Sequence, residues 1–155
     1  MISPEEMRMR IGRVREDLIR TRARDMLVIG LDMIALVKRR VINTGVTAEG
    51  QTFGVYSQAY QKQRARENLT EKPFPNKNFK RTTRMWNNTT ASIIKQGRDD
   101  VTVRLAPTTG EEVSKLEYNE KRSGSIIALS AKEKKTLDRS IERRYKRILI
   151  TNNII

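Results

Sequence analysis

The first forty residues of this chain carry the pattern of one long amphipathic helix. Ser3 precedes Pro4, and Glu6 follows the serine by three residues. This arrangement is typical of a helix start, because serine caps the first turn, proline fits its first position and glutamate completes a capping box. Apolar residues then recur at helical spacing, at Met7, Ile11, Val14 and Leu18 and again at Met26, Ile29, Met33, Leu36 and Val37. The pattern predicts a helix from residue 4 to about residue 41.

This helix has two unlike halves. Residues 20–25 are almost wholly polar and interrupt the apolar stripe. We therefore expect residues 1–25 to project from the body as a helical arm, whereas residues 26–42 pack on the core. Gly30 is expected to bend the helix slightly. The helix should end near Gly45, because glycine adopts the positive φ of a helix C-terminus.

The length and composition favour a single domain without an active site. A chain of 155 residues and 18.0 kDa forms one core, so residues 1–155 are expected to be one domain. The chain has no cysteine and no histidine. This excludes disulfides and thiolate zinc sites, and it removes the commonest general base. Asp99 and Asp100 adjoin in a predicted turn, where acidic residues serve local hydrogen bonding. We expect no enzyme and no catalytic, metal or cofactor site.

Two aromatic and basic segments in the middle of the chain are the expected source of core anchors. In residues 50–64, Phe53, Tyr56, Tyr60 and Arg64 follow one another at offsets of three, four and four, which places them on one helical face. In residues 79–93, Met85 and Trp86 open a short predicted helix. Amphipathic spacing marks packing more often than contact with a partner. We therefore expect five core anchors: Phe53, Tyr56, Tyr60, Met85 and Trp86. The alternative for Trp86 is an interface anchor.

The remaining elements complete an α+β prediction. The sequence patterns favour a central helix over residues 56–68, an extended basic loop over 71–80 and a short helix over 83–90. Strands are predicted over 91–95 and 100–105 with a turn between them, followed by a weak helix or loop over 111–120. A short strand over 126–129 and a capped C-terminal helix to about residue 149 complete the chain. The predicted fold is one domain with a long N-terminal helix, a central helix, a small antiparallel sheet with a hairpin, and a C-terminal helix.

The strong positive charge points to an acidic partner. The chain has 32 Lys and Arg against 18 Asp and Glu, a formal net charge of +14. Nucleic acid, an acidic protein ring or a membrane surface could each attract it. No apolar run reaches the length of about 18 residues needed to cross a bilayer, and we expect neither a secretion signal nor a membrane partner. The candidate interface or polyanion-contact residues are Arg8, Arg13, Arg20, Lys72, Lys77, Lys80, Arg81 and Arg84.

The order of three sequence blocks resembles a known group of proteins. The blocks are G-x-x-F-x-x-Y-S-x-x-Y-x-x-x-R at residues 50–64, the Thr-Arg-Met-Trp segment at 83–86, and L-S-x-x-E at 129–133. Their order resembles the tail-completion and neck (head-tail connector) proteins of tailed bacteriophages, within the virion-morphogenesis and HK97-type tail-component group. The blocks are short, and together with the intervening helices they cover nearly the whole chain. Phe79 and Thr83 stand where that group usually has leucine and glycine.

The resemblance implies a structural virion protein, assembled in the bacterial host cytoplasm. Such a subunit forms a homo-oligomeric ring at the head-tail junction, contacts portal, adaptor or tail-tube proteins, and surrounds the DNA passage. It uses no cofactor. The cations would then touch genomic DNA non-specifically or face an acidic portal. The alternative is a cytoplasmic nucleic-acid-binding module that uses the basic loop and the Arg-rich helix.

Overall fold

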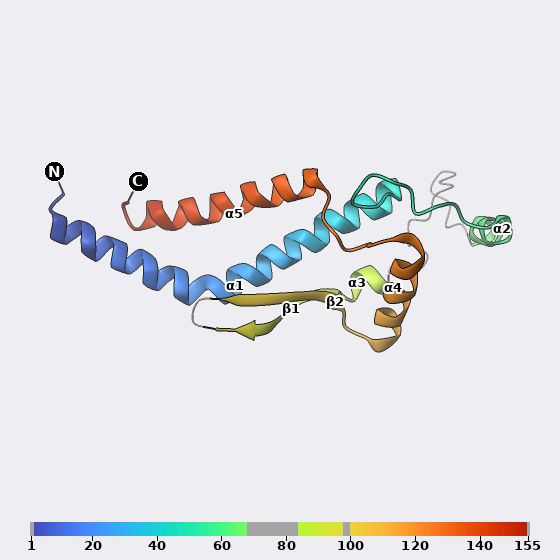
Figure 1. Ribbon diagram of the computed structural model, residues 1–155, viewed down its shortest axis with the longest axis horizontal. Helices are drawn as coiled ribbons and strands as arrows, with labels where there is room; N and C mark the ends of the chain where they lie inside the picture. Colours follow the sequence, from blue (N-terminus) through green and yellow to red (C-terminus); the bar gives the residue numbers. More distant parts are fainter. Residues whose placement is uncertain (1, 68–83, 98–99, 155) are drawn as a thin grey trace.

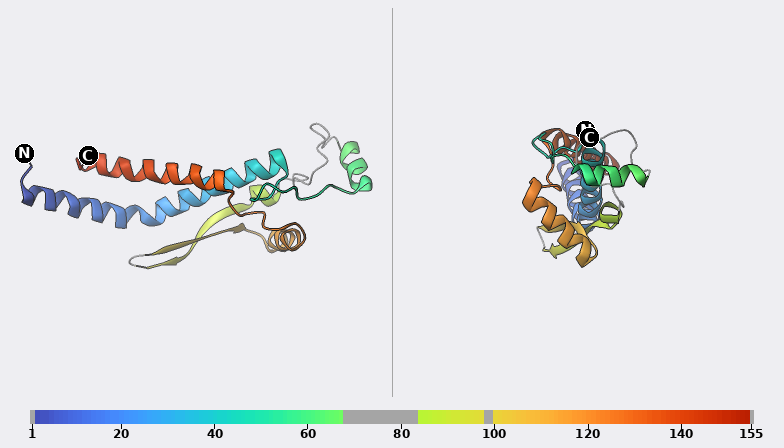
Figure 2. Two further views of the ribbon diagram at one scale, coloured as in Figure 1. Left: turned by 45° about the horizontal axis from the view of Figure 1, so that its top comes forward. Right: turned by 90° about the vertical axis from the view of Figure 1, so that its right-hand side faces the viewer.

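The computed structural model of the protein describes residues 2–67, 84–97 and 100–154. Within these ranges the chain forms five helices and one two-stranded antiparallel sheet in an elongated arrangement (Figure 1). Helix α1 (Pro4–Thr44) runs along most of the molecule. Helix α5 (Ala131–Thr151) lies along one side of α1 in the opposite direction, and the β-hairpin lies on another side (Figures 1 and 2). The predicted class, an α+β single domain, is confirmed.

Local sequence signals set both ends of α1. The Ser3 Oγ accepts a hydrogen bond from the Glu6 backbone N–H at 3.1 Å. The Glu6 carboxylate pairs with Arg10 at 2.7 Å. At the other end Gly45 has φ +61°, and its N–H donates to the Val41 carbonyl at 3.0 Å. Glycine adopts this left-handed conformation without steric cost, so the helix ends there as predicted.

The hairpin pairs β1 (Thr89–Gln96) with β2 (Val101–Pro107). Ala91 stands opposite Leu105, and a register shift between Ile93 and Lys95 interrupts the ladder. Val101, Val103 and Leu105 are half-buried whereas Thr102 and Arg104 are exposed, which confirms the predicted alternation. One face of the hairpin therefore packs against the rest of the molecule.

Gly30 is the point of closest approach between α1 and the hairpin. A Cβ at this position would lie 2.8 Å from the Ala91 Cβ, 3.1 Å from Leu105 Cδ2 and 3.2 Å from Val103 Cγ1. Such distances are too short for carbon atoms, so any larger residue would push the hairpin away. The structure thus gives Gly30 a packing role against the hairpin.

The main core surrounds the C-terminal end of α1. Its buried residues are Val37, Val41, Phe53, Met85, Trp86, Leu116 and Ile126. Met85 and Trp86 belong to the single turn α3 (Arg84–Asn87), and Trp86 is only 3% exposed. Phe53 lies in the core just before Gly54, whose φ of +83° redirects the chain. These three positions lie where the sequence predicted core anchors.

Tyr56 and Tyr60 are not core anchors, which corrects the prediction made for them. Both are half-buried and lie outside the core cluster. The reason is the position of helix α2 (Gln58–Arg66), which stands away from α1 and from the hairpin (Figures 1 and 2). The amphipathic spacing was real, but it organises contacts within the α2 segment.

Helix α4 (Gly110–Ser123) is a full helix where the sequence predicted a weak helix or a loop. Its first turn carries Glu111 and its last turn Lys121 and Arg122, which complement the helix dipole. Lys115 donates to Glu111 at 2.5 Å, and this raises the pKa of Lys115. Leu116 anchors the helix in the core.

The predicted strand over residues 126–129 is wrong. The described residues form only the β1–β2 sheet. The backbone N–H groups of Ile126 and Ile127 donate to the Glu120 carboxylate at 2.8 and 3.3 Å. A side chain of α4 thus satisfies donors that a strand partner would otherwise take. Ile126 is fully buried in the core, so its apolar side chain reflects core packing and not a strand.

Candidate assembly surface

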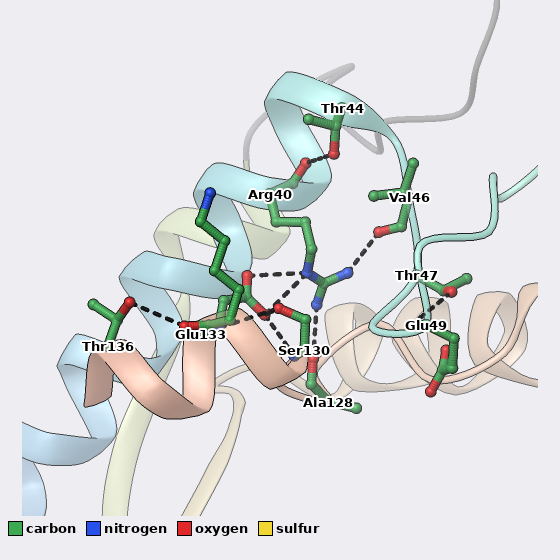
Figure 3. Close-up of polar contacts among 10 residues, drawn as sticks. Arg40, Thr44, Val46, Thr47, Glu49, Ala128, Ser130, Glu133 and Thr136 are labelled. Atoms are coloured by element: carbon green, nitrogen blue, oxygen red, sulfur yellow. Dashed lines mark hydrogen bonds and ion pairs between the residues drawn. The ribbon is translucent and has the colours of Figure 1, made fainter. Parts of the chain in front are cut away.

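A buried ion pair joins the end of α1 to the start of α5 (Figure 3). The Arg40 Nε donates to both carboxylate oxygens of Glu133, at 3.0 and 3.1 Å. Its Nη1 donates to the Val46 carbonyl at 2.5 Å and its Nη2 to the Ala128 carbonyl at 2.7 Å. Each of the two charged side chains is only 10% exposed. Arg40 therefore ties three separate segments together through one planar guanidinium.

The carboxylate of Glu133 also caps the start of α5. It accepts hydrogen bonds from the Ser130 N–H at 2.7 Å and from the Ser130 hydroxyl at 2.9 Å. The Ser130 Oγ in turn accepts from the Glu133 N–H at 3.3 Å, so the predicted capping box is present. The same few atoms fix where α5 begins and how it leaves the body (Figure 3).

The segment after α1 is also held locally. Thr47 is buried, and its hydroxyl accepts hydrogen bonds from the Glu49 and Gln51 N–H groups at 3.2 and 3.3 Å. Hydrogen bonding to Thr47 lowers the pKa of the Glu49 carboxyl. This turn keeps the Val46 carbonyl in place beside the Arg40 guanidinium (Figure 3).

Polar contacts continue along the two helices away from this ion pair. The Asp32 carboxylate accepts from the Ser140 hydroxyl at 3.3 Å and from Arg144 at 3.4 Å. Further along, the Asp17 carboxylate accepts from the Asn152 side chain at 3.1 Å. Near the two termini, Arg10 donates to the Asn153 carbonyl at 2.6 Å. Polar contacts therefore join α1 to α5 and the residues after it at three points along α1.

We call residues 2–25 together with residues 138–154 the arm. The predicted helical arm, residues 1–25, was a single helix, but the structure places the end of α5 beside it (Figure 2). Val14 is the one buried apolar residue of this helix pair among those described, and Leu18, Ile141, Ile148 and Leu149 are half-buried. An open hollow of about 390 Å³ lies at the end of the arm, lined by residues from both helices. The pair is held together but is not closed into a core.

Apolar side chains gather on the surface of the arm. Among the described residues, nine hydrophobic side chains are buried and eleven large ones are exposed. Seven of the exposed ones lie on the arm: Ile2, Met7, Met9, Ile11, Ile19, Tyr145 and Ile150. Single exposed apolar side chains are ordinary on a surface, but seven of the eleven large ones lie on these two segments of the chain. The arm is therefore the candidate assembly surface.

The arm is also basic. It carries twelve Arg and Lys against seven Asp and Glu, a net charge of +5. Arg8, Arg13 and Arg20, the predicted interface candidates on this helix, are all exposed. Arg20 is 78% exposed and pairs with Asp17 at 2.7 Å, which is a weak surface pair. Cations and apolar groups thus share one surface.

The α2 segment forms a second projecting unit. The Tyr56 and Tyr60 rings lie 4.9 Å apart between centroids, and the Arg64 guanidinium stacks 4.7 Å from the centroid of Tyr56. The Ser57 Oγ accepts from the Tyr60 N–H at 3.3 Å and caps the helix. Tyr56, Tyr60 and Arg64 thus lie together as predicted, but Phe53 does not share their face, because it precedes the helix and is buried in the core.

Several candidate residues lie outside the described part of the chain. They are Lys72, Lys77, Lys80 and Arg81, together with the rest of the predicted basic loop at 71–80. Arg84 is the first residue of α3. The sequence interpretation missed Arg40 and the exposed face of Met9 and Ile19, because these residues carry no motif that distinguishes them from ordinary helix positions.

The described residues offer neither a metal cluster nor a membrane span. Across residues 2–67, 84–97 and 100–154, no three acidic side chains gather closely enough to hold a metal ion. In the same ranges no helix combines the length and apolar character that crossing a bilayer requires. No protein family, curated protein or solved structure matches the chain.

Proposed function

We propose that this protein is a structural subunit of a tailed-bacteriophage virion, part of a ring at the head-tail junction. In this role it would be a neck, connector or tail-completion protein rather than an enzyme. The observation that carries the proposal is the arm, which exposes seven large apolar side chains beside a net charge of +5. A monomer gains nothing from such a surface in water, whereas a subunit of an assembly buries it against a partner protein.

The elongated shape supports the same function. A ring subunit must reach its neighbours and the proteins above and below, and here α1 and α5 extend far beyond the main core (Figures 1 and 2). The small core lies at one end of the molecule and the arm at the other, so different residues would stabilise the fold and bind the partner. The order of the three sequence blocks, which resembles that of neck and tail-completion proteins, supports the more specific assignment to the virion.

The positive charge fits the surroundings of the DNA passage. Cations that face the passage or an acidic portal would stabilise the junction while DNA remains able to slide, since phosphate contacts of this kind carry no sequence information. Assembly would take place in the host cytoplasm, and the finished location would be the virion.

The test is removal of the gene from the phage that carries it. We expect electron micrographs to show DNA-filled heads and separate or unfinished tails, with joined particles restored by the wild-type protein. A variant with Ile11→Glu and Ile150→Glu, both exposed arm positions, should fold but fail to restore joining. The control is Tyr118→Glu, an equally exposed position on α4, which should restore it. Normal infectious particles without the gene would overturn the proposal.

A further inference from the structure

Two glycines of α1 lie on the same helical face. Gly12 and Gly30 are 18 residues apart, which is about five full turns of an α-helix. Arg10 and Asp17, which contact the end of α5, lie on roughly the opposite side of the helix from Gly12. The face with the two glycines therefore points away from α5 along the whole of α1.

The molecule itself covers this face at Gly30. There the apolar side of the hairpin approaches so closely that a Cβ would lie 2.8 Å from Ala91. Strands β1 and β2 lie beneath the middle of α1 and do not follow the helix to its N-terminal end (Figures 1 and 2). The hairpin therefore covers this face of α1 near Gly30, and the same face continues uncovered toward the N-terminus.

At Gly12 the same face is open. No heavy atom would lie within 4 Å of a Cβ built there. Ile19, two turns further along this face, is 50% exposed, and Met9, which also lines the hollow at the end of the arm, is 57% exposed. We call the open position the Gly12 notch: it shares the helix face of Gly30, and no segment of the described chain covers it. Four exposed arginines and one exposed glutamate surround it: Arg8, Arg13, Arg15, Arg20 and Glu16.

We propose that the Gly12 notch, with Met9 and Ile19, binds an apolar segment of another protein that is flanked by carboxylates. The inference rests on the proposed function only in taking the chain to be an assembly subunit. Charge decides between the possible occupants. A second copy would bring another arm of net charge +5, which repels, whereas an acidic partner pairs with the surrounding arginines. A nucleic acid would leave Met9 and Ile19 in water.

Binding of designed peptides to the full chain tests this inference without any virion. The probe is a fluorescent amphipathic peptide with leucine and alanine on one helical face and glutamate on the other. A peptide of the same composition in scrambled order and a lysine counterpart serve as comparisons. We expect the amphipathic acidic peptide to bind and the two comparison peptides to bind at least about tenfold more weakly, because both the apolar face and the charge are needed.

The decisive variant is Gly12→Leu. It fills the notch but replaces glycine with a better helix former at an open position, so folding should be preserved. We expect its affinity for the acidic peptide to fall about tenfold or more, because the partner can no longer approach the helix backbone. The matched control is Gly110→Leu, at an equally open glycine on α4, which should bind like the wild type.

Four outcomes would overturn the inference. They are equal binding of the scrambled peptide, unchanged affinity of Gly12→Leu, self-association in sedimentation that Gly12→Leu abolishes, and DNA binding that depends on Gly12. Failure of the gene-removal experiment would count against the virion assignment and would leave the peptide result standing. The two proposals can therefore fail separately.

Discussion

The two halves of α1 are built from one continuous helix but do different work. In residues 26–44, Gly30, Ile34, Val37 and Val41 are buried, and Leu31 is the one large apolar side chain that is exposed. In residues 4–25, Val14 alone is buried, while four apolar side chains are exposed: Met7, Met9, Ile11 and Ile19. The second half buries its apolar face inside the chain, and the first half presents it to the outside.

This difference locates the stability of the protein. Val37 and Val41 are 0% exposed, and burying such a side chain contributes about 1.5–3 kcal/mol. The polar contacts that hold the arm are partly exposed, and contacts of that kind contribute about 1 kcal/mol or less each. Folding free energy therefore resides in the body, and the arm is free to carry residues chosen for a partner.

Truncation of the core aromatic is expected to have the largest effect on stability. Trp86→Ala removes a side chain that is 3% exposed, and we expect the free energy of unfolding to fall by about 3–5 kcal/mol, measured by denaturant titration. Tyr145→Ala, at a 42% exposed aromatic of the arm, should cost less than about 1 kcal/mol. If Trp86→Ala folds normally but fails to join particles, Trp86 is an interface anchor and the comparison is broken.

Removal of an arginine from each half of α1 should give the next largest difference in the free energy of unfolding. Arg40→Met leaves the Glu133 carboxylate without its partner at a site only 10% exposed. We expect a loss of about 3 kcal/mol in the free energy of unfolding, since an unpaired buried charge is strongly destabilising. Arg20→Met, in the arm, removes a pair with Asp17 from an arginine 78% exposed and should change stability by about 0.5 kcal/mol or less. Equal losses in denaturant titrations of the two variants would contradict the assignment of stability to the body.

The parts of the fold that could be predicted are those with local causes. Ser3 and Gly45 mark the ends of α1, and the Ser130–Glu133 box marks the start of α5, because each cap is made by residues a few positions apart. The strands followed from alternation. Helix α4 could not be predicted with the same ease, because Thr109 makes no side-chain cap and much of its support comes from the burial of Leu116. The four apolar residues at 126–129 have the pattern of a strand, but the Glu120 carboxylate accepts the N–H groups of Ile126 and Ile127 in place of a strand partner.

The candidate site was only half predictable for the same reason. Its exposed arginines are visible in the sequence as cations on a helix. The Arg40–Glu133 pair joins residues 93 positions apart, and no local pattern connects them. For Tyr56 and Tyr60 the spacing was read correctly but the contact was not, because helical spacing does not show whether a side chain packs on the core or on a neighbour in its own segment.

The two glycines of α1 separate the two halves by sign, because the same substitution should raise the free energy of unfolding in one half and lower it in the other. Alanine is a better helix former than glycine by about 0.5–1 kcal/mol. At Gly12 nothing opposes this gain, so Gly12→Ala should raise the free energy of unfolding by about that amount. At Gly30 the new Cβ would lie 2.8 Å from the Ala91 Cβ, and forcing the hairpin aside costs about 1–3 kcal/mol. Gly30→Ala should therefore lower the free energy of unfolding by up to about 2 kcal/mol.

The sign of each change in the free energy of unfolding is more informative than its size. Denaturant titration of both variants compares one substitution on one helix face, so helix propensity is held constant and only the cover differs. If both substitutions stabilise the protein, the hairpin yields easily at Gly30, and that contact is looser than its distances indicate. If both destabilise it, the face at Gly12 is already covered within the isolated chain. In that case the arm is no docking surface, and the division of α1 into a folding half and a contact half does not hold.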